Sequence, residues 1–318
     1  GMGKSSLIAG VRQHTLRADA LLAKAGGFEQ PWGTAPPRML TWLLGRCRSY
    51  AQSSPYSMWL DLLESWLGVG EEEPAEQTRD RLYQKAEELW GADFDERYPY
   101  LASLLSLPLE EHWLERVRHL DGEGRRQQYF LALRHWIEGL AKERPVVIAL
   151  EDLHWSDTTS LQLLDYCLPV CEQAPVLWLL AFREERTSPV WAFRQQVETE
   201  YPHRLAALAL APLTQDQAER MIDQLIGSHV LSHETRALIL EKSEGNPYYI
   251  EEFIHALMRE GVLIKDDLTE EWRAAREVDS LDLPDSLHNL LLARIDRLSP
   301  EERHVLQMAA VIGSVFWS

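Results

Sequence analysis

The chain has 318 residues, of which 45% are hydrophobic and 26% charged, a composition that excludes a wholly disordered protein. Its length suggests two domains of about 150 residues each. Acidic residues outnumber basic residues by 50 to 32, and the net charge of −18 argues against nucleic-acid binding through general attraction to phosphates. Apolar runs reach about nine residues where a membrane helix needs about 20, no secretion leader follows Gly1, and the three cysteines are too few for a disulfide framework, so we expect a cytoplasmic protein.

The first seven residues, Gly1-Met2-Gly3-Lys4-Ser5-Ser6-Leu7, match the second half of a phosphate-binding loop, G-x-x-x-x-G-K-[ST]. Glycine lets backbone N–H groups surround phosphate oxygens, Lys4 would neutralise the β- and γ-phosphates, and the Ser5 hydroxyl would ligate Mg²⁺. Helical spacing follows, which would place the phosphates at a helix N-terminus. The motif's first glycine and the strand before it are absent. The alternative that Gly1-Met2 is a cloning remnant and that Gly-Lys-Ser matches by chance therefore stays open. Because half of the loop is absent, we expect this chain to bind ATP poorly.

The next elements are a short strand and a long helical block. Residues 41–44 are expected to form a strand leading into Gly45-Arg46-Cys47, and Pro55-Tyr56 to mark a helix entry. Nearly all residues between Tyr50 and Arg144 have a helical pattern, with apolar residues recurring on one face. This block interrupts the sheet that the flanking strands predict.

Residues 146–150 form an apolar run rich in β-branched residues, which is typical of a buried parallel strand. Glu151 and Asp152 follow it, where parallel strands meet the ligand crevice. One such carboxylate holds Mg²⁺ in phosphate-loop enzymes, and the next can polarise the attacking water. The alternative is that both acids only favour a helix N-terminus, with Ser156 and Asp157 as caps.

A second buried strand is expected at residues 176–181, before Phe182-Arg183. Arg183 would either sense the γ-phosphate or pair with Glu184 or Glu185. A further strand is predicted from Leu205 to Leu210. The segments 176–181 and 205–210 are not expected to pair directly.

From Pro212 onward the chain has short helices with clear boundaries. Thr214 and Gln217 form a capping-box pattern, and a second such pattern opens at Ser299. Gly245-Asn246-Pro247 suits a helix end followed by an N-cap and a proline at the first turn of the next helix. These signals predict several helices.

Together these segments resemble the bacterial AAA-type ATPase module of the signal-transduction ATPases with numerous domains (STAND). The segments that carry the resemblance are Gly1–Leu7, Gly45-Arg46-Cys47 with Pro55-Tyr56, Pro145–Asp157, Ala181-Phe182-Arg183, Ser243–Glu252 and Leu283–Phe316. The resemblance implies an α/β P-loop NTPase core, with a parallel sheet lacking its first strand and a large helical insertion. An all-α lid and a truncated winged helix would follow. The implied domains are residues 1–211, 212–280 and 281–318.

The resemblance also implies residue roles. ATP and Mg²⁺ are the expected cofactors, and the residues expected to bind the nucleotide are Gly1, Gly3, Lys4, Ser5, Ser6, Asn246 and Pro247. Ser5 and Glu151 would hold the Mg²⁺. Asp152, Glu151 and the sensor residue Arg183 would be catalytic. The order Glu then Asp departs from the commoner Asp then Glu, so we expect slow hydrolysis. His154, Trp155 and Asp157 match a family signature without an assigned role.

The function that follows is an ATP-binding signalling switch of a multidomain bacterial regulator, with cyclase, kinase or DNA-binding output domains outside this chain. A ring-forming remodelling ATPase, with Arg183 or Arg186 as an arginine finger, stays open, as does a scaffold that binds no nucleotide. An oligomer of this chain that forms when nucleotide binds also stays open. Cys47, Cys167 and Cys171 are expected to be packing residues rather than metal ligands, and the tryptophans to be core residues.

Overall fold

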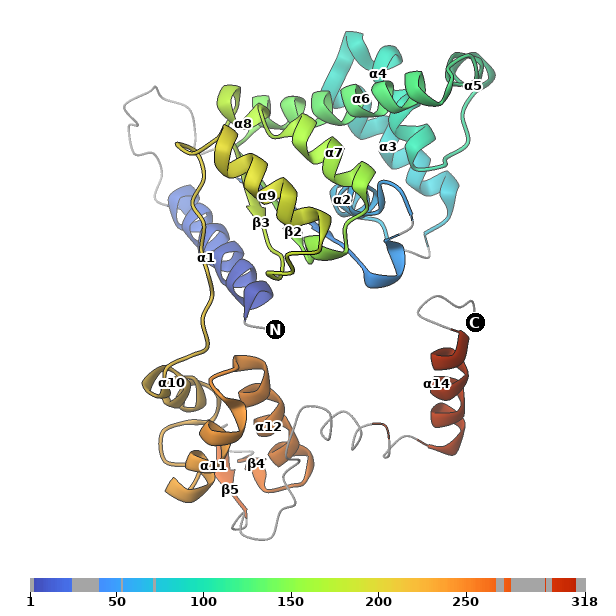
Figure 1. The fold of residues 1–318 in the computed structure, drawn as a ribbon. Helices are drawn as coiled ribbons and strands as arrows, with labels where there is room; N and C mark the ends of the chain where they lie inside the picture. Colours follow the sequence, from blue (N-terminus) through green and yellow to red (C-terminus); the bar gives the residue numbers. More distant parts are fainter. Residues whose placement is uncertain are drawn as a thin grey trace. The chain divides into compact units, whose positions relative to one another are not determined.

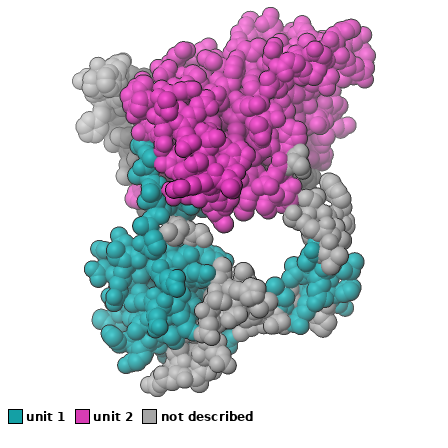
Figure 2. Space-filling view, in the orientation of Figure 1, with its two compact units in different colours: residues 1–6, 206–318 teal, residues 7–205 magenta. Residues whose placement is uncertain are grey.

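The structure is a computed structural model that describes residues 3–24, 40–52, 54–70, 73–266, 272–275, 295 and 299–312. Gly1 of the predicted loop and most of the predicted winged helix lie outside these residues. The chain divides into two compact units, residues 7–205 and residues 1–6 with 206–318 (Figure 2). Figure 1 labels the elements of both.

A three-stranded parallel sheet forms the centre of the unit of residues 7–205. Its order is β1 (Thr41–Arg46), β2 (Val146–Glu151), β3 (Val176–Leu180). Every residue of β2 is buried, because a parallel strand is covered on both faces, and this explains its unbroken apolar run. The three predicted strands and their parallel pairing are confirmed, but the expectation that the third strand is buried is wrong, because only Val176 of β3 is buried and Leu177 is 52% exposed.

Helices account for the rest of the regular secondary structure described between residues 4 and 200. They are α1 (Lys4–Lys24), α2 (Ser57–Leu67), α3 (Ala75–Trp90), α4 (Phe94–Leu104), α5 (Glu111–Arg118), α6 (Gly122–Glu143), α7 (Thr158–Cys167), α8 (Val170–Gln173) and α9 (Pro189–Glu200), with 3₁₀ helices η1 (Ser49–Ala51), η2 (Gly91–Asp93) and η3 (Leu153–Trp155). The helical block between Tyr50 and Arg144 is confirmed, and α2 begins directly after Tyr56. Helix α2 packs against β1, α6 contacts β2, and α9 packs against α7 and crosses in front of the sheet in Figure 1.

Large aromatic side chains fill the core of this unit. Trp59 and Trp136 are fully buried, and Trp59 Nε1 donates to the Ser160 carbonyl oxygen at 3.1 Å. Burial also raises the pKa of the Cys47 thiol to about 12 and raises that of Cys167, so both thiols stay neutral at physiological pH. Among the described residues no three His, Cys, Asp or Glu side chains gather as metal ligands.

Gly45 lets helix α2 approach the end of β1. A Cβ at this position would lie 2.8 Å from Leu62 Cγ and 3.0 Å from the Met58 carbonyl oxygen, both on α2. Any larger residue would push α2 outward. The glycine thus sets the distance between β1 and the helix that anchors its carboxyl end.

The predicted strand from Leu205 to Leu210 is wrong. Residues 205–214 have no regular secondary structure, and the Leu208 side chain is 80% exposed. A strand needs a neighbour to pair its N–H and C=O groups, and among the described residues β3 pairs with β2 alone. Because no strand forms there, the expectation that this segment and residues 176–181 would not pair stays a prediction.

The described residues of the other unit form four helices and a β-ribbon after residue 206. Its elements are α10 (Gln215–Ile226), α11 (His233–Ser243), α12 (Pro247–Arg259), β4 (Leu263–Lys265), β5 (Trp272–Ala274) and α14 (Pro300–Ile312). Both predicted capping boxes are present, at Thr214 with Gln217 and at Ser299 with Glu302. The ribbon shows that residues 212–280 are not all α. Val262 and Leu263 are buried in the helical core, and antiparallel pairing with β5 satisfies the backbone that follows them.

Candidate nucleotide and magnesium site

The carboxyl ends of the parallel strands bring the predicted acidic residues to one edge of the sheet. Arg46 and Glu151 are the last residues of β1 and β2 and stand opposite each other in the register. Asp152 follows β2 directly, and Arg183 follows β3 by three residues. Ligands of open parallel sheets bind outside this edge, so it is the candidate site of this unit.

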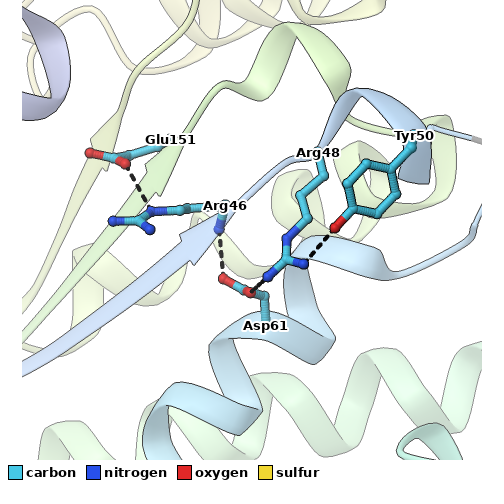
Figure 3. A network of polar contacts seen from close by, with 5 residues as sticks. All are labelled: Arg46, Arg48, Tyr50, Asp61 and Glu151. Carbon is cyan, nitrogen blue, oxygen red and sulfur yellow. Dashed lines mark hydrogen bonds and ion pairs between the residues drawn. The ribbon is translucent and has the colours of Figure 1, made fainter. Parts of the chain in front are cut away.

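Glu151 is a buried carboxylate with a positive partner. Its side chain is only 7% exposed, and Oε2 accepts a hydrogen bond from Arg46 Nε at 3.2 Å, while the Arg46 side chain is 59% exposed (Figure 3). A carboxylate removed from water is costly unless a charge or a metal compensates it. Arg46 provides that compensation from the neighbouring strand.

A second carboxylate anchors the end of β1 to helix α2. Asp61 Oδ2 accepts from the backbone N–H of Arg46 at 2.9 Å, and Asp61 Oδ1 lies 3.6 Å from an Arg48 Nη. Arg48 also donates to the Tyr50 hydroxyl at 2.5 Å (Figure 3). The backbone that carries Arg46 is therefore held on both sides, by the strand ladder and by α2.

Asp152 has an unusual backbone conformation at the turn after β2. Its φ of 56° and ψ of 35° lie in the left-handed region, which Asp and Asn tolerate better than most residues. The next N–H, that of Leu153, donates to the Ala181 carbonyl oxygen at 3.1 Å, so the turn is tied to the segment after β3. Such conformations concentrate at functional sites.

Asp157 and His154, two residues of the family signature, have structural roles. Asp157 caps α7 by accepting from the Ser160 N–H at 2.8 Å and the Ser160 hydroxyl at 2.5 Å. The His154 carbonyl oxygen accepts from the Ser188 hydroxyl at 3.2 Å, just before α9. The N-cap of α7 is thus Asp157, and Asp152 makes no side-chain cap hydrogen bond at the start of the 3₁₀ helix that follows it.

Trp155 lies beneath the predicted sensor arginine. The Arg183 guanidinium carbon is 5.7 Å from the centre of the Trp155 ring, within cation–π range. The structure records no ion pair of Arg183 with Glu184 or Glu185 among the described residues, and Glu184 lies 3.7 Å from Arg194 instead. Arg183 is exposed, so its charge is accessible to an anion.

The described part of the predicted phosphate loop has the expected local geometry. Gly3 has a φ of +80°, a conformation that favours glycine, and Lys4, Ser5 and Ser6 form the first turn of α1. The first N–H groups of a helix have no partner within it and can bind an anion. A Cβ on Gly3 would lie 3.5 Å from Pro247 Cγ, which brings the loop residue and the Gly-Asn-Pro motif together.

Each residue of Gly245-Asn246-Pro247 shapes the turn between α11 and α12. Gly245 has a φ of +72°, and a Cβ there would collide with the Leu213 carbonyl oxygen. Asn246 is the N-cap of α12, with Oδ1 accepting from the Tyr248 N–H at 3.1 Å, and Pro247 occupies the first helical turn. The predicted helix end, cap and helix start are confirmed. Whether Asn246 and Pro247 also contact a nucleotide stays a prediction.

Arg46, Asp61 and Trp155 were not predicted to have functional roles. A charged residue that ends an apolar strand, directly opposite an acidic residue ending the next strand, would have pointed to Arg46. Recognising that Arg46 lies opposite Glu151 requires the pairing register of β1 and β2, and two apolar runs in a sequence do not specify that register. Asp61 lies within a helix, where an acidic residue is ordinary.

Two family descriptions match the chain. The first, AAA ATPase domain, matches residues 1–179, and the second, a domain of unknown function (DUF8739), matches residues 214–268. No curated protein matches significantly. In the described part of the chain, we find no helix with the length and apolar character needed to cross a membrane. The first match spans more than half of the chain, and it includes both the loop residues and the acidic pair, so this chain belongs to the AAA ATPase domain family.

Proposed function

We propose that this chain is the ATP-operated switch module of a multidomain bacterial regulator of the STAND class. The observation that supports it most is the acidic pair Glu151-Asp152 at the carboxyl edge of a parallel sheet, in a chain of the AAA ATPase domain family. ATP and Mg²⁺ would bias two arrangements of the core, the lid and the segment that follows, by contacting them differently.

The available donors suit Mg²⁺. This ion prefers oxygen ligands and usually takes one or two carboxylates together with substrate phosphates and waters, instead of an all-protein cage. The Glu151 carboxylate and the Ser5 hydroxyl would supply such oxygen donors. Bound Mg²⁺ would neutralise charge on the β- and γ-phosphates.

The remaining roles belong to residues of the chain. Lys4 binds phosphate oxygens at the start of α1, Asp152 holds the attacking water as general base, and Arg183 stabilises charge on the γ-phosphate. Because the Asp152 side chain is one methylene shorter than that of Glu, hydrolysis is slow. Binding and release of nucleotide then set the lifetime of each signalling state.

The test is calorimetric titration of the full-length protein with the non-hydrolysable ATP analogue AMP-PNP and Mg²⁺. Lys4→Ala should weaken binding by about 10- to 100-fold, because it removes a charge-assisted contact. Arg12→Ala, which removes an exposed positive charge farther along α1, is the matched control and should leave binding unchanged. Equal affinity in Lys4→Ala and the unaltered protein would overturn the assignment of this loop.

The rival function as a ring-forming remodelling ATPase makes a different prediction. A finger arginine acts on the nucleotide of a neighbouring subunit, so activity per subunit would rise with protein concentration. The switch proposal predicts constant activity per subunit across the same concentration range.

A further inference from the structure

We propose that Arg46 is a positioning residue that holds Glu151 in the orientation in which its carboxylate ligates the nucleotide-bound Mg²⁺. This inference rests on the proposed function, since it assigns a role toward the same metal. From the sequence, Gly45-Arg46-Cys47 is only a segment that carries the family resemblance, and Arg46 has no assigned role. The evidence is the geometry of the pair and of its supports.

The hydrogen bond engages one side of the carboxylate. Arg46 Nε donates to Glu151 Oε2 at 3.2 Å, and no contact of Arg46 with Oε1 is seen. One oxygen is therefore held from the protein side while the other is left for a metal. Carboxylates that ligate metals are commonly oriented in this way by hydrogen bonds from an outer shell, and those partners tune metal affinity.

The backbone of Arg46, which carries the guanidinium, is held in place. Arg46 stands opposite Glu151 in the parallel register, and the next ladder bond, from the Cys47 N–H to the Glu151 carbonyl oxygen, is 3.0 Å long. Asp61 holds the Arg46 N–H from the other side at 2.9 Å (Figure 3). The close approach of α2 at Gly45 brings Asp61 into range. The strand ladder and the Asp61 hydrogen bond thus fix the backbone of the residue that orients Glu151.

The Arg46–Glu151 pair also compensates a buried charge. The Glu151 side chain is 7% exposed and would be an uncompensated buried charge in the absence of metal. Arg46 compensates it from a side chain that is largely in water and can keep its own solvation. The carboxylate can thus be oriented before the metal arrives.

The experiment measures metal affinity directly. The full-length protein is saturated with AMP-PNP and titrated with Mn²⁺ as a spectroscopic substitute for Mg²⁺, while electron paramagnetic resonance reports the free ion. Arg46→Gln should weaken Mn²⁺ binding by about 10-fold, within the range found for outer-shell partners. Arg46→Lys should recover part of the loss. Arg134→Gln removes an arginine from an Arg–Glu pair of similar geometry, 2.9 Å, on α6, and should leave Mn²⁺ affinity unchanged.

Two further measurements separate positioning from other roles. AMP-PNP affinity in EDTA should be the same in Arg46→Gln and the unaltered protein, because Arg46 acts through Glu151 and not on phosphate. In a Glu151→Gln background, Arg46→Gln should cause no additional loss of Mn²⁺ affinity, because the group it positions is gone.

The outcomes distinguish this inference from the proposed function. Unchanged or tighter Mn²⁺ binding in Arg46→Gln overturns the positioning role, and so does an additive loss in the Glu151→Gln background or a loss of affinity in EDTA. In those cases the unaltered protein still binds AMP-PNP and the proposed function stands. If the unaltered protein binds no AMP-PNP, the proposed function fails and this inference fails with it.

Discussion

The region of residues 7–205 has helix caps such as Asp157 and also a polar pair at two strand ends, whereas in the region of residues 206–275 the polar and glycine residues described above fix helix ends. In the first, Arg46 and Glu151 stand at strand ends beside a large aromatic core, and their bond serves no helix or turn. In the second, Thr214, Gly245 and Asn246 fix helix ends around a smaller core. Polar residues that do not stabilise a helix end or a turn are therefore the better candidates for a functional site.

The comparison predicts two cores that unfold separately. Trp59→Ala should lower the stability of the first region by about 4 kcal/mol, because it empties a fully buried site and removes the hydrogen bond to Ser160. The transition of the second region should not move. Differential scanning calorimetry checks this, with Trp59→Phe as the smaller change, and a single transition displaced as a whole would contradict two independent cores.

The second region should be most sensitive at Gly245. Gly245→Ala should cost about 3 kcal/mol, because it adds a collision with the Leu213 carbonyl oxygen to the strain of a φ of +72°. Gly261→Ala is the matched control, since Gly261 has a φ of +66° but open space around it, and should cost about 1 kcal/mol. Chemical denaturation followed by circular dichroism measures both. Equal losses would show that strain alone, and not packing against Leu213, explains the glycine.

A substitution at the acidic pair should affect turnover without affecting the fold. Asp152→Asn should lower the ATP hydrolysis rate of the full-length protein by about 100-fold, because Asn accepts no proton, and should leave AMP-PNP affinity within about twofold. Asn also tolerates the φ of 56° at this position. Steady-state phosphate release provides the rate. Retained hydrolysis would remove Asp152 from the role of general base.

The buried thiol of Cys47 makes the first region sensitive to alkaline pH. Burial raises its pKa from 9.0 to about 12, so its contribution to stability is complete below pH 9.0 and declines as pH rises toward 12, because the unfolded chain ionises first. The loss should be about 1 kcal/mol at pH 10. Denaturant unfolding at pH 8 and pH 10 tests this, and Cys47→Ala should show a smaller decrease. An identical decrease in the two proteins would show that other groups govern the pH dependence.

The smallest effect is expected at a helix cap of the second region. Thr214→Ala should lower stability by about 1 kcal/mol, because the N–H of Gln217 loses its acceptor. Thr214→Ser keeps the oxygen and should change little. If both variants are equally stable in denaturant unfolding, the capping box contributes nothing measurable.

Sequence patterns predicted the elements with strong local signals. The strand before Glu151, the cap at Asn246 and the helix start after Tyr56 were all expected, because periodicity and caps are local properties. The strand at 205–210 and the all-α character of 212–280 were wrong, because pairing depends on a neighbour that no short segment encodes. For the same reason the sequence did not indicate a role for Arg46, because that role depends on its register with Glu151. The acidic pair itself was found because it follows an apolar run directly.

The most direct measurement is the calorimetric titration of the full-length protein with AMP-PNP, in the presence of Mg²⁺ and in EDTA. We predict saturable binding of one nucleotide per chain that Mg²⁺ strengthens. Glu151→Gln should remove that strengthening while binding in EDTA persists. Absence of binding under both conditions, or binding that Mg²⁺ and Glu151→Gln leave unchanged, would contradict an ATP-operated module.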